Sequence, residues 1–555
     1  MSDRHFAFWP KGLPRHLTIP ATNLFYNVEV SATRYPAKPC LVFYDTPITY
    51  AEVRDECERL AGFLERECGV AKGDRVILFA QNSPQFVIGY YAILRANAVV
   101  VPVNPMNLTE ELAHHVADSG AKVAIVAQEL YARTKPLLGN GLDRIVVAAY
   151  SDYLRQPTDL AVPDFVRAPR LPVAEPGVTA WADALAANLA PGPLIAGPDD
   201  LCVMPYTSGT TGQPKGCMHT HRSAMHTLVA GAQWFGTTQD AVFLAVLPFF
   251  HVTGMQGGMS GPLWLGATVV LLARWDRDAA ARLIERYRVT AWTAITTMVV
   301  DFLANPRVGE YDLSSLARMS GGGAAMPEAV AQAMQERFGI TYVEGYGLTE
   351  TIAPSHINPP ERAKKQCLGI PIFDTDSRVV DPETLAELGP GEVGEIVTHG
   401  PQVFRGYWND PEKTAAAFVE IDGRRFFRTG DLGRVDEDGY FFITDRLKRM
   451  INAAGFKVWP AEVEAMLYGH PAVQEACVIA AADPRRGETV KAVVVLREAH
   501  RGKVGEQEII DWAHARMAAY KAPRIVEFVD ALPKSGTGKV MWRALQEAER
   551  SRAQT

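Results

Sequence analysis

The sequence predicts an α/β protein with a large N-terminal domain of mostly parallel sheets and a small α+β domain at its C-terminal end. Between residues 48 and 130, segments with helical periodicity alternate with apolar runs, which indicates a parallel sheet covered by helices on both faces. The chain has 555 residues, well beyond the ~250–300 residues at which a single hydrophobic core stops growing. At least two domains are therefore expected.

The first helices and strands carry clear local signals. Thr49 and Glu52 have the spacing of a capping box, which opens an amphipathic helix. Ser83 and Pro84 start a second helix, with the serine as its N-cap and the proline in its first turn. Apolar runs typical of buried strands occupy residues 75–80, 99–103 and 123–126.

Residues 151–197 interrupt this alternation. They are rich in proline and alanine and contain few periodic apolar runs, so we expect an excursion on the surface and assign it no function. The α/β pattern resumes with strand-like runs at residues 241–247 and 267–273.

A second kind of sheet is expected towards the C-terminal end. Residues 391–397 and 439–443 are short strands bounded by glycine, which is typical of antiparallel sheet and indicates a small β subdomain near residues 375–444. After Asp445-Arg-Leu-Lys448 the pattern becomes a compact α+β stretch of about a hundred residues, long enough for its own core. The predicted domains are residues 1–444 and 445–555.

Composition and charge exclude several classes of protein. The net charge of −7 gives no basic field to hold a polyanion, so nucleic acid is not an expected partner. The seven cysteines form no Cys-x-x-Cys pair, and their odd number argues against a disulfide framework. The best candidate for a membrane-spanning helix, residues 86–103, contains Arg95 and Asn97. The first residues lack a secretory signal, so a cytoplasmic location is expected, and peripheral membrane contact stays open.

Residues 206–216, Tyr-Thr-Ser-Gly-Thr-Thr-Gly-Gln-Pro-Lys-Gly, combine the residue types that bind phosphate. Glycines allow close approach of the backbone, hydroxyls and amides donate to phosphate oxygens, and Lys215 adds a positive charge. The spacing is not that of a Walker A loop. On composition alone, a flexible surface turn explains the segment equally well.

The order of these residues resembles the signature loop of the adenylate-forming superfamily, which includes acyl-CoA synthetases, luciferases and peptide-synthetase adenylation domains. Four further segments resemble the other signatures of this superfamily, in the same order: Tyr346-Gly-Leu-Thr-Glu350, Phe427-Arg-Thr-Gly-Asp431, Asp445-Arg-Leu-Lys448 and Pro533-Lys-Ser-Gly-Thr-Gly-Lys539. The resemblance covers about residues 30–545.

The resemblance implies an enzyme that joins a carboxylate to the α-phosphate of ATP. Because both groups are anions, positive charge and preorganised donors must supply most of the catalysis. Glu350 and Thr210 are expected to hold Mg²⁺, while Thr349 contacts the α-phosphate and Asp431 accepts from the ribose hydroxyls. The implied ATP- and AMP-binding residues are Thr207, Ser208, Gly209, Thr210, Thr211, Gly212, Lys215, Gly322, Gly323, Ala324, Tyr346, Gly347, Thr349, Asp431 and Arg446. Standing alone, Asp431 is typical of an ordinary turn, and residues 321–325 are typical of a glycine-rich loop.

The resemblance also implies a second step, the transfer of the acyl group to coenzyme A. Lys539 on the small domain bridges the carboxylate and the α-phosphate first, and the domain then rotates about a hinge at Lys448. His251 resembles the family histidine beside the acyl carboxylate, although a lone histidine between aromatic residues is more often packed in a core. The implied CoA-binding residues are Gly455, Phe456 and Lys457, and the implied catalytic residues are Lys539, His251, Thr349 and Glu350.

The acid is expected to carry one carboxylate. The segments that form the acyl pocket by family analogy, residues 292–302, 321–325 and 343–354, contain no Arg or Lys to pair with a second carboxylate. Residues 445–452 and 455–460 resemble proteobacterial medium- or long-chain fatty-acid–CoA ligases, and an aromatic acid is the alternative substrate. An acyl-AMP ligase that loads a carrier protein also shares the motifs, but the chain has no Gly-Gly-x-Ser attachment segment. Luciferase-type chemistry, the chain length of the acid and homodimeric assembly stay open. An inactive relative of the family is expected to have lost Glu350, Asp431 or Lys539.

Overall fold

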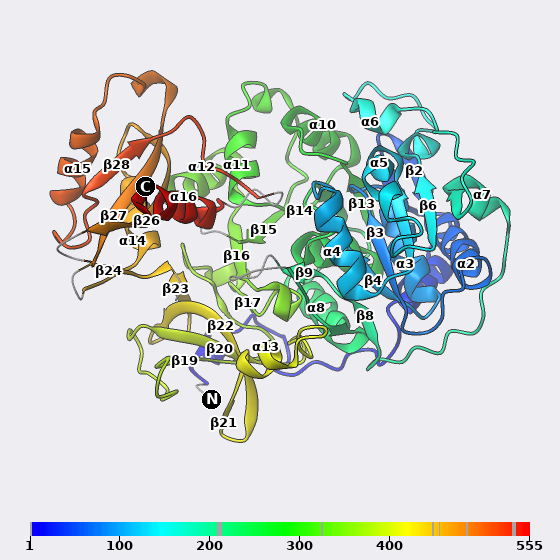
Figure 1. Cartoon of the computed structure of the whole chain (residues 1–555), viewed down its shortest axis with the longest axis horizontal. Helices are drawn as coiled ribbons and strands as arrows, with labels where there is room; N and C mark the ends of the chain where they lie inside the picture. Colours follow the sequence, from blue (N-terminus) through cyan, green and yellow to red (C-terminus); the bar gives the residue numbers. More distant parts are fainter. Residues whose placement is uncertain are drawn as a thin grey trace. The chain divides into compact units, whose positions relative to one another are not determined.

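A computed structural model of the chain describes residues 3–207, 214–323, 326–446, 449–453, 456–483, 487–535 and 540–554. The described residues form two compact units (Figure 1). The larger unit contains residues 3–376 and 398–427, and the smaller unit contains residues 377–397 and the chain from 428 onwards. The predicted domain boundary at residue 445 stays a prediction.

The larger unit contains a seven-stranded sheet in the order β11-β8-β4-β3-β5-β6-β7. Its strands are parallel except β11, which is antiparallel to β8. The strands are β3 (Arg75–Phe79), β4 (Val99–Pro102), β5 (Val123–Ala127), β6 (Arg144–Ala148), β7 (Val178–Ala180), β8 (Leu201–Val203) and β11 (His219–Thr220). The accompanying helices are α2 (Tyr50–Arg66), α3 (Pro84–Arg95), α4 (Thr109–Ser119), α5 (Tyr131–Thr134), α6 (Asp164–Arg167) and α7 (Trp181–Ala186).

A nine-stranded sheet, in the order β18-β17-β16-β15-β14-β12-β13-β1-β2, forms the other half of the larger unit. The strands from β1 to β16 in this order are parallel, and β2, β17 and β18 join antiparallel at the two edges. The strands are β1 (Pro39–Phe43), β2 (Thr46–Thr49), β12 (Val242–Ala245), β13 (Thr268–Leu271), β14 (Ala291–Thr293), β15 (Arg318–Gly322), β16 (Tyr342–Tyr346), β17 (His356–Ile357) and β18 (Ile370–Pro371). The helices are α1 (Phe25–Arg34), α8 (His221–Trp234), α9 (Gly261–Leu265), α10 (Arg277–Tyr287), α11 (Thr296–Leu303) and α12 (Glu328–Phe338). Buried apolar side chains of both sheets form one continuous core.

A third, antiparallel sheet has the order β19-β20-β22-β21, with β23 paired to β22. Its elements are β19 (Asp376–Val380), β20 (Gly394–His399), α13 (Pro411–Ala416), β21 (Phe418–Ile421), β22 (Arg424–Val435) and β23 (Phe441–Arg446). The predicted antiparallel subdomain near residues 375–444 is confirmed in its sheet type.

The end of the chain forms an α+β fold with a core of its own. Its sheet has the order β25-β24-β27-β26, with β28 parallel to β27. The elements are β24 (Ile451–Ala453), β25 (Phe456–Val458), α14 (Pro460–Leu467), β26 (Val473–Asp483), β27 (Gly487–Leu496), α15 (Glu506–His514), β28 (Ile525–Phe528) and α16 (Trp542–Gln554). The predicted fold class, α/β with a small C-terminal α+β part, is confirmed.

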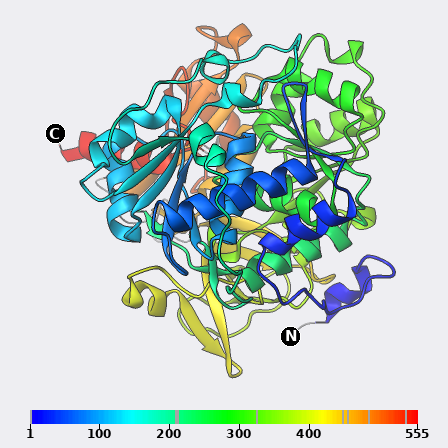
Figure 2. The same cartoon turned by 90° about the vertical axis from the view of Figure 1, so that its right-hand side faces the viewer.

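Local predictions hold at both helix starts. Thr49 caps α2 with the reciprocal bonds of a capping box to Glu52, and the Ser83 side chain accepts from the backbone N–H of Phe86 at the start of α3. Near the N-terminus of the chain, Trp9 directly follows η1 (Arg4–Phe8), which is dark blue beside the N in Figure 2. The Trp9 ring packs edge-on against the ring of Trp234, with 4.8 Å between the ring centroids, and anchors this segment.

The expected surface excursion at residues 151–197 is more ordered than its composition indicates. It adds strand β7 to the edge of the seven-stranded sheet, and it buries Trp181. The Trp181 indole N–H donates to the Tyr153 hydroxyl (3.2 Å), which donates to the buried carboxylate of Glu56. The segment therefore contributes one strand and a few buried side chains to the core, while most of its residues lie at the surface.

Within the described part of the chain, no helix is long and apolar enough to cross a membrane.

Candidate active site

The two ends of the phosphate loop form a short antiparallel pair. In β9 (Tyr206–Thr207) and β10 (Lys215–Gly216), Lys215 lies opposite Thr207 and Gly216 lies opposite Tyr206. A Cβ atom on Gly216 would come within 2.9 Å of the Met204 side chain, so a larger residue here would require that side chain to shift. The predicted ligands between these ends, Ser208, Gly209, Thr210, Thr211 and Gly212, lie outside the described residues.

Thr349 and Glu350 open a single helical turn, η7 (Thr349–Thr351), close behind the carboxyl end of β16. The next two residues, Ile352 and Ala353, have φ angles of 42° and 20°. This left-handed conformation costs a residue other than glycine on the order of 1–3 kcal/mol and is typically retained at functional sites. The turn that carries Glu350 is therefore held by its surroundings, with Ile352 fully buried.

His219 fixes the same turn from β11. Its Nε2–H donates to the backbone carbonyl of Thr349 (2.7 Å). Burial lowers the pKa of His219 to about 4, so the ring is neutral at pH 7 and keeps its single proton on Nε2 for this bond. Sequence reasoning missed His219 because nothing in its local pattern points to a residue 130 positions away.

Glu350 and Lys215 meet at one tyrosine, Tyr407, in the segment after β20. The Tyr407 hydroxyl donates to Glu350 Oε1 (2.8 Å), and Lys215 Nζ lies 4.5 Å from the centroid of the Tyr407 ring. The backbone N–H of Phe404 donates to the Glu350 carbonyl (2.8 Å). Burial, together with the Glu350 charge, raises the pKa of Tyr407, so its hydroxyl stays protonated and donates. Sequence reasoning missed Tyr407 as well.

The chemistry of this group fits Mg²⁺ held together with a polyphosphate. Glu350 is 9% exposed and offers a carboxylate, the hard oxygen ligand that Mg²⁺ prefers. Among the described residues, no cluster of three or more His, Cys, Asp or Glu side chains is arranged to hold a metal ion alone. Proteins usually hold Mg²⁺ through one or two carboxylates together with substrate phosphates and water, and Glu350 offers one such carboxylate.

The predicted glycine-rich loop begins as a strand. Gly321 and Gly322 end β15, where a Cβ would come within 1.8 Å of the Ala294 carbonyl oxygen and 2.2 Å of the Gly345 carbonyl oxygen, respectively. Gly323 has a φ of 89°, a conformation that favours glycine. Close packing between strands therefore explains the first two glycines without a ligand, and Ala324 lies outside the described residues.

Tyr346 and Gly347 follow on the neighbouring strand. Tyr346 ends β16, and a Cβ on Gly347 would come within 2.9 Å of Ala353 Cα. The preceding strand residue Glu344 is buried, and its Oε1 accepts from the backbone N–H of Met326 (3.1 Å). Burial raises the pKa of Glu344 to about 7. Glu344, a residue that sequence reasoning missed, thus anchors the chain directly after residues 321–325.

His251 lies in a turn that a buried asparagine holds. Asn82 Nδ2 donates to the Leu247 carbonyl (2.9 Å), and the Phe249 N–H donates to Asn82 Oδ1 (2.8 Å). His251 itself is partly exposed, and the π-helical turn Gly254–Ser260 follows, a feature frequent at functional sites. These observations argue against a core histidine, the alternative that its aromatic neighbours suggested.

Asp431 belongs to the smaller unit, in the long strand β22. It is 1% exposed and lies opposite Arg446 on β23. Gly430, with a φ of 67°, precedes it, and the Asp431 N–H donates to Thr429 Oγ1 (3.1 Å). Asp431 is therefore a buried strand residue and not an ordinary turn residue.

The structure does not describe the side chains of the remaining predicted residues. Lys448, Gly455 and Lys539 are not among the described residues, and the side chains of Arg446, Phe456 and Lys457 are not described. Their roles stay predictions.

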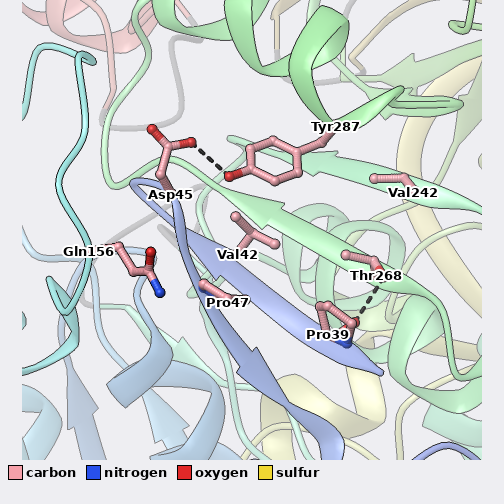
Figure 3. A pocket seen from close by; sticks show the side chains of 8 residues that line it. All are labelled: Pro39, Val42, Asp45, Pro47, Gln156, Val242, Thr268 and Tyr287. Atoms are coloured by element: carbon pink, nitrogen blue, oxygen red, sulfur yellow. Dashed lines mark hydrogen bonds between the residues drawn. The ribbon is translucent and has the colours of Figure 1, made fainter. Parts of the chain in front are cut away.

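A cavity of about 360 Å³ lies along the strands at the β1–β2 edge of the nine-stranded sheet (Figure 3). Its lining extends from Pro39, at the start of β1, to Asp45, in the turn after β1, and includes Val242 and Thr268 at the starts of β12 and β13. In the order of the sheet, β14 separates these strands from β15 and β16, whose carboxyl ends border the candidate active site. The cavity is therefore separate from the candidate active site.

Comparison with known proteins agrees with this geometry. Residues 28–408 match the family model described as AMP-binding enzyme, and residues 462–539 match the one described as AMP-binding enzyme C-terminal domain. The first match covers more than half of the chain.

Two curated relatives span nearly the whole chain. A long-chain-fatty-acid–CoA ligase of Bacillus subtilis (strain 168) is 35% identical over 559 residues, covering 98% of this chain and 97% of that protein. A feruloyl-CoA synthase of an Amycolatopsis species is 38% identical over 500 residues, covering 89% of this chain and 93% of that protein.

The fold also matches a solved structure along its length. The crystal structure of the anthranilate CoA ligase AuaEII in complex with anthranoyl-AMP superposes with a TM-score of 0.83 at 27% identity, covering 98% of this chain and 99% of that chain. The chain therefore belongs to the AMP-binding enzyme family of the adenylate-forming superfamily and is an AMP-forming acid–thiol ligase.

Proposed function

We propose that this chain is an ATP-dependent acyl-CoA synthetase for a monocarboxylic acid, a medium- or long-chain fatty acid. In the first step a carboxylate oxygen attacks the α-phosphorus of ATP, which forms acyl-AMP and releases pyrophosphate. In the second step the sulfur of CoA attacks the acyl carbonyl, the thiol proton is released, and AMP leaves. The observation that carries the proposal is the group formed by Glu350, Tyr407 and Lys215 beside the ends of the phosphate loop.

Charge placement supports the first step. Lys215 and Thr207 lie opposite each other at the ends of the loop, where they would hold the pyrophosphate part of ATP with the loop residues between them. Thr349 would contact the α-phosphate from its fixed turn. Glu350 would hold Mg²⁺, which when bound offsets the negative charge of the phosphates. Gly322, Gly323 and Tyr346 would border the adenine.

Residues of the smaller unit and His251 would complete the two steps. In the first step Asp431 would accept from the ribose hydroxyls and Lys539 would contact the carboxylate and the α-phosphate, and Lys448 would then act as the hinge for the second step. His251, held by the Asn82 bridge, would lie beside the acyl carboxylate. Gly455 and its neighbours would border the pantetheine arm of CoA.

An aromatic acid is the second candidate substrate. The feruloyl-CoA synthase matches at slightly higher identity than the fatty-acid ligase, although over a shorter stretch, and the anthranilate ligase shares the fold. Both substrate classes are monocarboxylic, in agreement with the absence of Arg and Lys from the sequence segments expected to form the acyl pocket.

A substrate panel separates these proposals. Pyrophosphate release is measured with fatty acids from C2 to C18, benzoate, anthranilate and ferulate, each with and without CoA, and the thioester is identified by mass spectrometry. We expect the highest kcat/KM with a medium- or long-chain fatty acid and sustained turnover only with CoA. Preference for ferulate or benzoate would replace the fatty-acid proposal, and turnover without CoA would contradict the ligase proposal.

A further inference from the structure

Helix α4 contacts both ends of the phosphate loop with residues one turn apart. His114 and Asp118 lie at positions i and i+4 of this helix, so their side chains share one face. We call Tyr206–Thr207 and Pro214–Lys215 the two stems of the loop. Each stem is contacted by one of these two side chains.

The first stem is held through Tyr206. Its hydroxyl donates to Asp118 Oδ2 (2.6 Å), and its ring packs against the ring of His115 with 4.5 Å between centroids. Burial, reinforced by the Asp118 charge, raises the pKa of Tyr206, so the hydroxyl remains a donor at neutral pH. A hydrogen bond to a charged acceptor is stronger than one between neutral groups.

The second stem is held through its main chain. His114 Nε2 lies 2.9 Å from the carbonyl oxygen of Pro214, the residue before Lys215. Because a carbonyl only accepts, the proton of this bond lies on Nε2. The position of Lys215 is thus tied to α4 by a bond that ends one residue away.

The same helix is joined to the segment that contacts Glu350. The Asp118 carbonyl accepts from Trp408 Nε1 (3.0 Å) and from Asn409 Nδ2 (3.1 Å). The backbone N–H of Trp408 donates to the Gly216 carbonyl (2.8 Å), and Tyr407 precedes it in the chain. The C-terminal turn of α4 therefore meets both the loop stems and the partner of Glu350.

We propose that His114 and Asp118 are positioning residues that brace the two stems of the phosphate loop, so that Thr207 and Lys215 lie where they can bind the β- and γ-phosphates of ATP. The proposal rests on the proposed function in that Thr207 and Lys215 bind these phosphates. The brace touches neither nucleotide nor acid. It holds the two loop stems at a fixed separation and fixes where the Lys215 backbone lies.

Binding of two nucleotides tests the brace without turnover. Affinities for MgATP and for AMP are measured by isothermal titration calorimetry, without any acid, in wild type, His114→Ala, Asp118→Ala and Tyr206→Phe. We expect about tenfold weaker ATP binding in each variant, the scale of one lost charged or buried hydrogen bond. AMP binding should change less than about twofold, since AMP lacks the phosphates that the loop binds. The Asp118→Ala substitution removes only the side chain, so the backbone carbonyl of residue 118 still accepts from Trp408 and Asn409.

Three further variants sharpen the result. The double variant Asp118→Ala/Tyr206→Phe should bind ATP as weakly as either single variant, because both remove one hydrogen bond. His114→Gln places an amide N–H near the position of Nε2 and should restore ATP binding. Glu110→Gln changes an exposed side chain on the same helix and serves as the control, with both affinities unchanged.

The outcomes are distinct. Equal losses for ATP and AMP, or unchanged ATP binding, would overturn the brace and assign His114 and Asp118 to general folding. A chain that binds ATP but activates no acid in the panel would overturn the proposed function and leave the brace standing. Wild type that binds neither nucleotide would overturn both.

Discussion

The larger unit contains two polar clusters that differ in how their charged groups are paired. In the Asp45 cluster, beside the cavity in Figure 3, Asp45 accepts from the Tyr287 hydroxyl (2.7 Å), from the Thr158 hydroxyl (2.6 Å) and from Arg286. In the Glu350 cluster, formed by Glu350, Tyr407 and Lys215, Lys215 forms no ion pair within the described part of the chain and lies over the ring of Tyr407. The polar groups of the Asp45 cluster are paired with one another, whereas the Glu350 cluster places the positive charge of Lys215 at the end of the phosphate loop.

The difference separates a structural cluster from a binding site. The Asp45 cluster joins the β1–β2 turn to α10 and to the segment after β6, so its groups use their hydrogen-bonding capacity within the chain. The Glu350 cluster lies next to strained backbone and to the ends of a phosphate loop. We therefore expect an ionic ligand at the Glu350 cluster and none at the Asp45 cluster.

The largest effect is expected from Glu350→Gln. The substitution keeps an oxygen to accept from Tyr407 but removes the negative charge, so pyrophosphate release should fall by ~10²-fold or more, the scale for removing a preorganised charge. The melting temperature should change little because the shape is kept. Stopped-flow pyrophosphate detection and calorimetry provide the two measurements. A variant with near-normal pyrophosphate release would contradict the proposed role of Glu350.

A smaller effect is expected from Asn82→Ala, which removes the bridge that holds the His251 turn. Acid activation should fall by about tenfold, and stability should fall by ~1–3 kcal/mol because a buried N–H and a buried carbonyl lose their partner. The matched control is Asn305→Ala, which removes another buried amide bridge, to Asp278 and to the N–H of Arg307. The control should lose stability alone; equal losses of activity in both variants would argue against a specific role for Asn82.

The Asp45 cluster gives the converse prediction. Asp45→Asn weakens charge-assisted bonds to Tyr287 and Arg286, so urea unfolding should show a loss of ~1–3 kcal/mol with kcat/KM unchanged. Asparagine tolerates the φ of 66° at this turn, so the substitution adds no backbone strain. Loss of activity at constant stability would instead place a functional site at the cavity.

The smallest effect is a pH dependence of stability at Glu344. Burial raises its pKa in the folded chain to about 7, above the ~4.3 of an unfolded glutamate. The folded state then binds the proton more tightly, so this contribution to stability is full below about pH 4 and is lost as pH rises through about 7. Glu344→Gln should therefore become more stable relative to wild type by ~1–3 kcal/mol between pH 4 and pH 8 in urea unfolding. A constant difference across this range would contradict the raised pKa.

Sequence reasoning succeeded where the signal is local. The capping box at Thr49, the Ser83-Pro84 helix start and the buried strands follow from short patterns, and the motif of residues 346–350 led to Glu350. It missed Tyr407 and Asn82, because their hydrogen bonds span 57 and 165 residues and leave no periodic trace. It also underestimated residues 151–197, since the three residues of β7 are too few to show a strand period.

The most direct test of the central claim is a product analysis of one reaction. The wild-type chain is incubated with ATP, Mg²⁺, CoA and dodecanoate, then with ferulate in place of dodecanoate, and all products are quantified by mass spectrometry. We expect acyl-CoA, AMP and pyrophosphate in equal amounts, with the acyl-adenylate as the only acyl product when CoA is left out. Formation of ADP and phosphate, or of an adenylate that never passes to CoA, would contradict it.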